Sequence, residues 1–192
     1  MTGNKNKGPV PALIFRAGPV FSSVLPLILG VLAVLLLVLG WAGRQHLLLI
    51  REAEHSRGLL VGFLAPGEGF QLRYIHSVDR LPVYDEFRFL DGELVLTGTR
   101  CFCFGAGLGY TGEGVLRGEN GWDVIDGMHR PADLLPLRVG TVADHTLLYR
   151  RREIYLKQYF RGQTLVHLEV VRLSPGILFG VLKGEIILCG RA

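Results

Sequence analysis

The sequence predicts a mainly β fold, an antiparallel sandwich or barrel-like domain preceded by one N-terminal transmembrane helix. Two observations lead to this expectation. Residues 17–43 carry no charged side chain, and about 20 apolar residues in a helix are enough to cross the hydrocarbon core of a bilayer. From Leu47 onward, apolar residues recur at every second position in several runs, which is the pattern of strands with one buried face.

The apolar segment divides the chain into three parts. We expect residues 1–16 to form a cytoplasmic tail, residues 17–43 a transmembrane anchor, and residues 44–192 an extracytoplasmic β domain. A cleavable signal peptide is the alternative, with Gly40 and Ala42 as the small residues before the cut, but its apolar stretch would be shorter. Both interpretations export the domain.

The charges around the apolar segment predict its orientation. Three basic residues and no acidic residue precede it, and as many basic residues follow it closely. The short basic leader decides between the two orientations, because such a leader typically stays inside while the bulk of the chain crosses. We therefore expect a single-pass protein of the cytoplasmic membrane, with its N-terminus inside.

Four runs after the anchor predict strands. They are Phe70–His76, the run that begins at Leu81, the run from Leu94 to Phe104, and Thr164–Leu173. Asp91-Gly92 lies between two of these runs and predicts a hairpin with a type I′ turn. Eight or nine strands without intervening helices are typical of a sandwich or barrel.

The remaining segments predict turns, a short helix and a loop. Arg161-Gly162 and Lys183-Gly184 resemble turns. Pro131 and Asp133 are typical of a helix start and predict a short helix near Pro131 to Leu137. Residues 105–130 are rich in glycine and poor in strand signals, so we expect a long ordered loop there.

Composition excludes several classes of protein. The formal net charge is +4, and much of it comes from the first 16 residues, whereas a nucleic-acid-binding protein concentrates basic residues on one face. Nucleic acid is therefore not an expected partner. The three cysteines are too few for a disulfide scaffold. We expect them to be small buried side chains, with a bond between Cys189 and either Cys101 or Cys103 as the alternative.

Residues 107–112 match the pattern G-x-G-x-x-G. A dinucleotide site also needs a helix that begins at the glycines, and the sequence that follows does not predict one. The glycines instead indicate positive φ angles or close packing of the backbone.

Residues Tyr74 to Phe87 hold the densest group of polar side chains. We expect it to form a hairpin, and its candidate ligand-binding or partner-binding residues are His76, Ser77, Asp79, Tyr84 and Glu86. The competing interpretation is a buried polar network that only stabilises the hairpin.

Two further residues of this hairpin sharpen the expectation. Asp85 shares a face with Val83 and Phe87, so its carboxylate needs a partner, and Arg80 or His76 can provide it.

Metal binding and hydrolysis are further possibilities at this hairpin. His76, Asp79 and Glu86 are residue types that bind divalent metals. Ser77 is the obvious nucleophile for a hydrolase, but it follows His76 directly and points to the opposite face if both lie on a strand. Ser77 also lacks the G-x-S-x-G elbow.

Three motifs together carry a resemblance. They are Tyr74-Ile-His-Ser-Val-Asp79 with Pro82-Val and Glu86, then Phe104-Gly-Ala-Gly-Leu108, and then His145-Thr-Leu147. This pattern resembles a bacterial domain-of-unknown-function family of small exported or membrane-anchored proteins, over about residues 46–175. Their genes often lie beside TRAP transporters of the TAXI type, which pair an extracytoplasmic solute receptor with a membrane permease. This chain has Asp79 where the relatives have Glu.

The resemblance implies a function but no reaction and no cofactor. The leading hypothesis is a non-enzymatic, membrane-anchored accessory protein whose partners are the membrane and a TRAP-type permease or its solute receptor. We expect the contacts to come from the hairpin at 76–86, from the glycine-rich loop with Gly105 and Gly107, and from His145. The alternatives are a small-molecule or metal-binding module and a cell-surface hydrolase.

Overall fold

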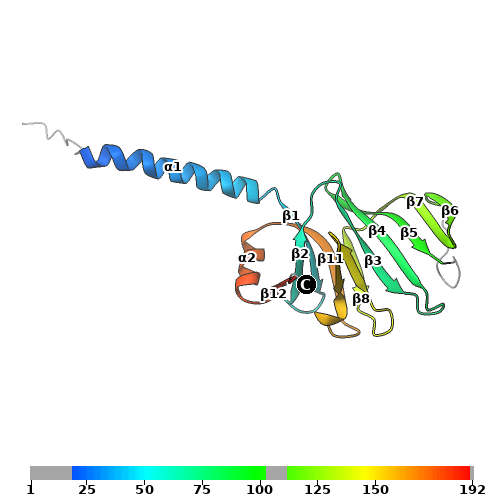
Figure 1. Ribbon diagram of the computed structural model, residues 1–192. Helices are drawn as coiled ribbons and strands as arrows, with labels where there is room; N and C mark the ends of the chain where they lie inside the picture. The colour runs from blue at the N-terminus through cyan, green and yellow to red at the C-terminus, as the bar shows by residue number, and fades with distance from the viewer. Residues whose placement is uncertain (1–18, 103–111, 191–192) are drawn as a thin grey trace, which may run out of the picture. The chain divides into compact units, whose positions relative to one another are not determined.

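The computed structural model describes residues 19–102 and 112–190, and the chain is mainly β, as the sequence predicts (Figure 1). The chain divides into an N-terminal unit that ends at Trp41 and a β unit that begins at Ala42. Gly105, Gly107 and Cys103 lie outside the described residues.

The N-terminal unit contains one long helix, α1 (Pro19–Ala42). Its window Val24–Ala42 is long and apolar enough to cross a membrane. A signal sequence passes the same test of length and composition. None of the window is buried against protein within the described residues, so an aliphatic surface with no polar face remains uncovered.

The β unit consists of two sheets. The first sheet has five strands in the order β12-β2-β1-β11-β8, and the second has seven in the order β10-β9-β3-β4-β5-β7-β6. Neighbouring strands are antiparallel, except that β12 runs parallel to β2. The five-stranded sheet comprises β12 (Ile186–Leu188), β2 (Gly58–Phe63), β1 (His46–Glu52), β11 (Leu165–Arg172) and β8 (Leu134–Arg138). The seven-stranded sheet comprises β10 (Arg152–Tyr155), β9 (Thr146–Tyr149), β3 (Gly69–Ile75), β4 (Pro82–Leu90), β5 (Glu93–Cys101), β7 (Trp122–Pro131) and β6 (Val115–Glu119).

One hydrophobic core joins the two sheets. Leu48 and Ile50 of β1 belong to the same buried cluster as Phe87 and Phe89 of β4 and Leu94 of β5. The alternation along β3 and β4 places every second side chain in this core, which confirms the period-two pattern. The 3₁₀ turn η1 (Leu156–Gln158) adds Leu156 to the core.

A second, smaller cluster lies on the other face of the five-stranded sheet. There the short helix α2 (Pro175–Leu182) packs Ile177 against Leu47 and Leu49 of β1 and Ile186 of β12. The sequence did not predict this helix. Ser174 caps it, because its Oγ accepts a hydrogen bond from the N–H of Ile177 at 3.4 Å, and Pro175 occupies the first turn.

Several predicted turns are confirmed. Asp91 and Gly92 both have positive φ angles, of 51° and 92°, as a type I′ hairpin requires. The N–H of Thr164 bonds to the carbonyl of Arg161, which closes the turn predicted at Arg161-Gly162. Lys183-Gly184 is also a turn, but it ends α2, with Gly184 at a φ of 73°.

Two segment predictions are wrong. The helix expected near Pro131 to Leu137 is absent, because β7 ends at Pro131 and β8 begins at Leu134. Asp133 does not open a helix. Its carboxylate accepts a hydrogen bond from the N–H of Leu94 at 3.1 Å and so joins two strands.

The loop expected over residues 105–130 is also corrected where the structure describes it. From Val115 onward this segment is the hairpin of β6 and β7, with positive φ angles at Asn120 and Gly121. Cys101 and Cys189 form no disulfide bond with each other. Cys101 is buried as expected, whereas Cys189 is only partly buried.

Candidate functional site

The turn between β3 and β4 is held by His76. Strand β3 ends at Ile75, so His76 and Ser77 lie in the turn and not on a strand. The N–H of His76 donates to the carbonyl of Leu81 at 2.9 Å. The Nδ1 atom of His76 lies 3.1 Å from a carboxylate oxygen of Asp79. The imidazole and this carboxylate therefore fix the turn from within.

Ser77 stands apart from this pair. It is exposed, and within the described part of the chain it makes no hydrogen bond to His76 or His145. A serine nucleophile needs a base within hydrogen-bonding reach, so the turn does not assemble the Ser–His pair that a hydrolase would use.

Tyr84 and Glu86 lie on a different surface from the turn. Their neighbours Val83, Asp85 and Phe87 alternate with them along β4 and face the core side, so Tyr84 and Glu86 face outward. Glu86 accepts a hydrogen bond from Arg88 at 2.9 Å.

The metal alternative therefore lacks a ligand set in the structure. Among the residues described, no group of three or more His, Cys, Asp or Glu side chains is placed to hold a metal ion. Glu86 in particular does not join His76 and Asp79.

Asp85 lies in a polar cluster on the core-facing side of the seven-stranded sheet. Its carboxylate accepts a hydrogen bond from the Thr99 hydroxyl at 2.9 Å and also interacts with the Tyr74 hydroxyl. The prediction that Arg80 or His76 is the partner of the Asp85 carboxylate is therefore wrong. Burial raises the pKa of Asp85 above its ordinary value. The pKa of Tyr74 is also raised, mainly by burial and to a lesser extent by the negative charge of Asp85.

His145, the residue directly before β9, joins this cluster. Its ring centroid lies 5.7 Å from that of Tyr74, and its Nδ1 accepts a hydrogen bond from the N–H of Gly140 at 3.2 Å. The residue is only 9% exposed, and burial lowers the pKa of the imidazole. The structure therefore brings His145 next to Tyr74, and the resulting buried cluster joins β3, β4, β5 and the start of β9.

Replacing Asp85 by asparagine should stabilise the protein at pH 7. The raised pKa of Asp85 means that its charged form costs stability at neutral pH, and that cost disappears as the pH falls towards the ordinary value of 3.8. Asparagine keeps an acceptor for Thr99 without the charge. Urea unfolding of the full chain in mild detergent should show a higher midpoint for Asp85→Asn at pH 7 and a gap that closes in acid. Glu93→Gln, at an exposed carboxylate, is the control and should show no such pH-dependent gap.

A second cluster lies on the outer face of the same sheet. The rings of Phe102 and Trp122 are 3.9 Å apart, and the Tyr84 ring meets Trp122 edge-on at 5.7 Å. The Arg100 guanidinium lies 4.6 Å from the Trp122 centroid and 5.2 Å from that of Tyr84. We call Tyr84, Arg100, Phe102 and Trp122 the aromatic–arginine cluster. Of these four, sequence reasoning had proposed only Tyr84.

Cross-strand pairing explains this cluster. Tyr84 lies opposite Arg100 in the β4–β5 ladder, and β7 follows β5 directly in the sheet, so that Arg100 lies opposite Val124. Trp122 begins β7 and thereby reaches Phe102, just beyond the end of β5. Phe102 is 40% exposed, so the cluster presents aromatic surface to solvent.

A small hollow adjoins the cluster. It has a volume of about 220 Å³, and Tyr84, Glu86 and Arg100 contribute to its lining. An ion pair between Arg117 and Asp126 crosses its far side. Pockets for small molecules usually measure roughly 300–1,000 Å³, so this hollow is small for a ligand site of its own.

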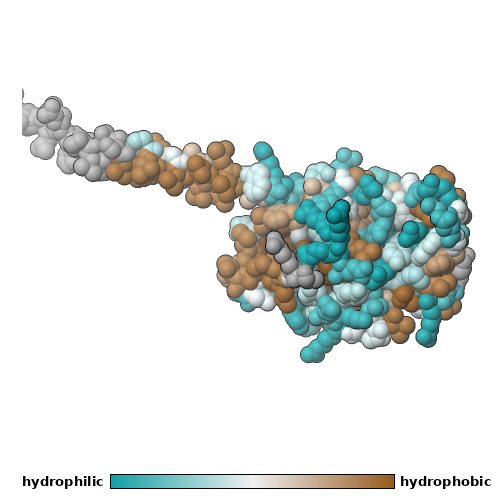
Figure 2. Space-filling model, in the orientation of Figure 1, coloured by the Kyte–Doolittle hydropathy of each residue, from teal (hydrophilic) through white to brown (hydrophobic). Residues whose placement is uncertain are grey.

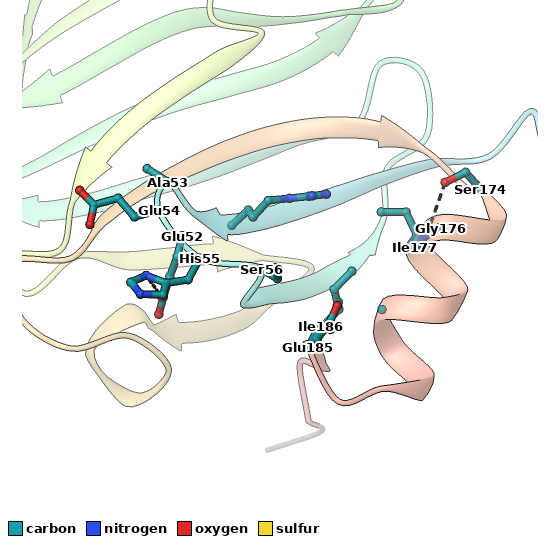
Figure 3. A pocket seen from close by; sticks show the side chains of 12 residues that line it. Glu52, Ala53, Glu54, His55, Ser56, Ser174, Gly176, Ile177, Glu185 and Ile186 are labelled. Atoms are coloured by element: carbon teal, nitrogen blue, oxygen red, sulfur yellow. Dashed lines mark hydrogen bonds and ion pairs between the residues drawn. The ribbon is translucent and has the colours of Figure 1, made fainter.

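A larger hollow lies elsewhere, beside the five-stranded sheet and α2 (Figure 3). Its volume is about 590 Å³, and its lining includes Glu54, His55 and Glu185. His55 approaches the nearly buried Glu52 at 3.4 Å. None of the residues proposed from the sequence lines it.

Fold and surface together define a class of protein: a two-sheet β domain with an exposed aromatic–arginine cluster, following a helix that can cross a membrane. Residues 70–156 match the family model of a domain of unknown function, DUF1850. This confirms the resemblance to a domain-of-unknown-function family. No curated protein and no solved structure matches the chain.

The matched segment has a structural meaning. It begins in β3 and ends in η1, so it includes the seven-stranded sheet and β8. The polar cluster around Asp85 and the aromatic–arginine cluster both lie within it. Helix α2, β12 and the hollow of Figure 3 depend largely on residues outside it.

Proposed function

We propose that the protein is a membrane-anchored, extracytoplasmic accessory protein that binds another protein through the aromatic–arginine cluster. The partner is the permease or the solute receptor of a TRAP-type transporter of the TAXI kind. Helix α1 would cross the cytoplasmic membrane with its N-terminus inside. The aromatic–arginine cluster is the observation that carries the proposal of protein binding, and the sequence resemblance is what indicates the partner.

The residue types of the cluster favour a protein partner. Tyrosine, tryptophan and arginine are enriched at the residues that dominate binding energy in protein interfaces. Arg100 already lies against two aromatic rings that also contact each other, so little side-chain entropy is lost when a partner covers it. The adjoining hollow is small, which disfavours a small molecule as the main ligand.

Anchoring explains how modest contacts can suffice. A domain attached to the same membrane as its partner binds in an effectively intramolecular way, with an effective concentration far above that of a free protein. A weak surface can then give a stable association, and a catalytic centre is not needed.

Cross-linking in native membranes tests the proposal. Tagged full-length protein, expressed with a TAXI-type receptor and permease, should yield cross-linked peptides of one of them. Replacing Arg100 and Trp122 together by alanine should reduce the yield at least tenfold, since residues of this kind contribute about 2 kcal/mol or more each. The control is Arg161→Ala, which changes an exposed arginine in the turn between η1 and β11 and should leave the yield unchanged. Recovery of neither transporter protein, with the receptor–permease pair itself captured, would contradict the partner assignment.

A further inference from the structure

Helix α2 exposes an apolar surface that lacks a polar face. Leu178, Phe179 and Leu182 are 54%, 57% and 84% exposed, and the helix contains only apolar residues and glycines besides its first proline. Leu188 of the adjacent β12 is 57% exposed as well. We call these four residues the α2 patch. Figure 2 shows hydrophobic colouring over the α2 region of the β unit.

Such a surface is unusual for a helix that faces water. A surface helix normally carries polar residues opposite its buried face, and the buried face of α2 is formed by Ile177 and Gly180. Strand β12 is also an edge strand, and exposed apolar edges are normally covered. The α2 patch therefore requires a cover that the chain itself does not supply within the described residues.

Chain connectivity places the start of α2 beside the short linker that joins α1 to β1. Helix α1 ends at Ala42 and β1 begins at His46, and four fully extended residues span at most about 14 Å. Inside the β unit, the N–H of Leu173 bonds to the carbonyl of Gln45 at 2.9 Å. Since Ser174 caps α2 directly afterwards, the helix begins beside the linker whatever the orientation of α1.

The charges around the patch fit a lipid surface. Arg44 and Arg172 are exposed in the linker and just before α2, and Lys183 follows its last turn, 3.9 Å from the Glu185 carboxylate. The Lys183 ammonium lies over the Phe179 ring at 4.6 Å. Basic residues close to a membrane surface are attracted to anionic headgroups, and exposed apolar side chains bind at the headgroup–acyl boundary in proportion to the apolar area that they bury.

We infer that α2 docks onto the lipid surface from which the β unit emerges, with the α2 patch inserted at the headgroup–acyl boundary. This inference rests on the proposed anchoring by α1 and adds a second, peripheral contact with the same membrane. It fixes the orientation of the β unit, because α2 covers the outer face of the five-stranded sheet. The seven-stranded sheet with the aromatic–arginine cluster then remains free for a protein partner.

Depth-dependent fluorescence quenching tests the inference on the full chain. The protein carrying Leu182→Trp is reconstituted into vesicles of brominated phosphatidylcholine and phosphatidylglycerol. Leu182 is so exposed that the larger side chain leaves the core intact. The introduced tryptophan should lose most of its emission compared with vesicles of unbrominated lipid. Val115→Trp, at a 63% exposed residue on the edge strand of the other sheet, is the matched control and should not be quenched.

Each other outcome has a defined meaning. The native Trp41, isolated by difference from Trp41→Phe, reports whether α1 enters the bilayer. Quenching of Trp41 without quenching at position 182 would overturn the docking and leave the anchoring intact. Quenching at neither position would overturn both. Blue-shifted but unquenched emission at position 182 would mean that a protein covers the patch, and would also overturn the inference.

Discussion

Replacing Gly69 by alanine should destabilise the β unit by about 3 kcal/mol, near the upper end of the usual cost of overpacking. Gly69 is the first residue of β3 and lies opposite Arg88 of β4. A Cβ atom at this position would overlap the carbonyl oxygen of Phe87 and lie 3.0 Å from the Arg88 Cγ. The obstacle is backbone, so the two strands would have to separate. Urea unfolding of the full chain in mild detergent, followed by circular dichroism, measures the loss.

Gly118 provides the matched control for Gly69. It also lies in a strand of the seven-stranded sheet, but no heavy atom lies within 4 Å of the Cβ that alanine would add. Gly118→Ala should change the stability by less than about 0.5 kcal/mol, as is usual for exposed positions. Equal effects at the two glycines would contradict the steric explanation.

The same hairpin supports both polar and aromatic clusters. Strand β3 supplies Tyr74, whereas β4 supplies Asp85 to the inner face and Tyr84 to the outer face. Gly69→Ala is therefore expected to weaken the cross-linking that depends on Trp122, although Gly69 touches neither cluster. A loss of stability with full cross-linking would show that the outer surface tolerates a displaced β3.

Local alternation made the faces of β3 and β4 predictable. The sequence places Phe70, Leu72 and Tyr74 on one side, and it identifies Asp85 as a carboxylate on the side of Val83 and Phe87. The structure confirms both faces. What could not be predicted is the partner of Asp85, because a partner across a sheet depends on strand order and register. Thr99 lies opposite Asp85 only because Thr97 is bulged out of the β4–β5 ladder.

The aromatic–arginine cluster escaped prediction for a related reason. Trp122 and Phe102 are separated by a glycine-rich segment that resembles a loop, and only the β5–β7 pairing brings their rings together. The signal within that segment was Asn120-Gly121, a type I′ turn pair between two runs of strand-forming residues. Reading that turn would have revealed the β6–β7 hairpin.

Helix α2 was missed because it is apolar all round. A helix is recognised in sequence by the contrast between an apolar and a polar face, and α2 has no polar face. Ser174-Pro175 was the readable sign, since serine caps helices and proline favours the first turn. The lack of a polar face, which makes α2 hard to recognise in the sequence, is also the property on which the proposed docking to lipid rests.

Introducing arginines into the middle of α1 should remove the protein from the membrane. Leu32 and Leu36 lie in the central turns of the window Val24–Ala42, one turn apart on the same side. Each arginine near the centre of a spanning helix costs about 2.5–3.5 kcal/mol of insertion free energy, so Leu32→Arg with Leu36→Arg should cost about 6 kcal/mol. After alkaline carbonate washing, the unmodified full-length chain should remain with the vesicles and the double variant should appear in the supernatant.

A control variant with an arginine at the end of α1 separates the loss of anchoring from other effects of an added arginine. Ala42→Arg adds a basic residue at the last position of α1, where a long cationic side chain reaches the headgroups, and this variant should stay with the vesicles. No part of the α1 window is covered by protein in the described chain, so its apolar surface is available to lipid. If the double variant resists carbonate as well as the unmodified chain does, α1 does not hold the protein in the bilayer, and the effective-concentration argument for a transporter partner loses its basis.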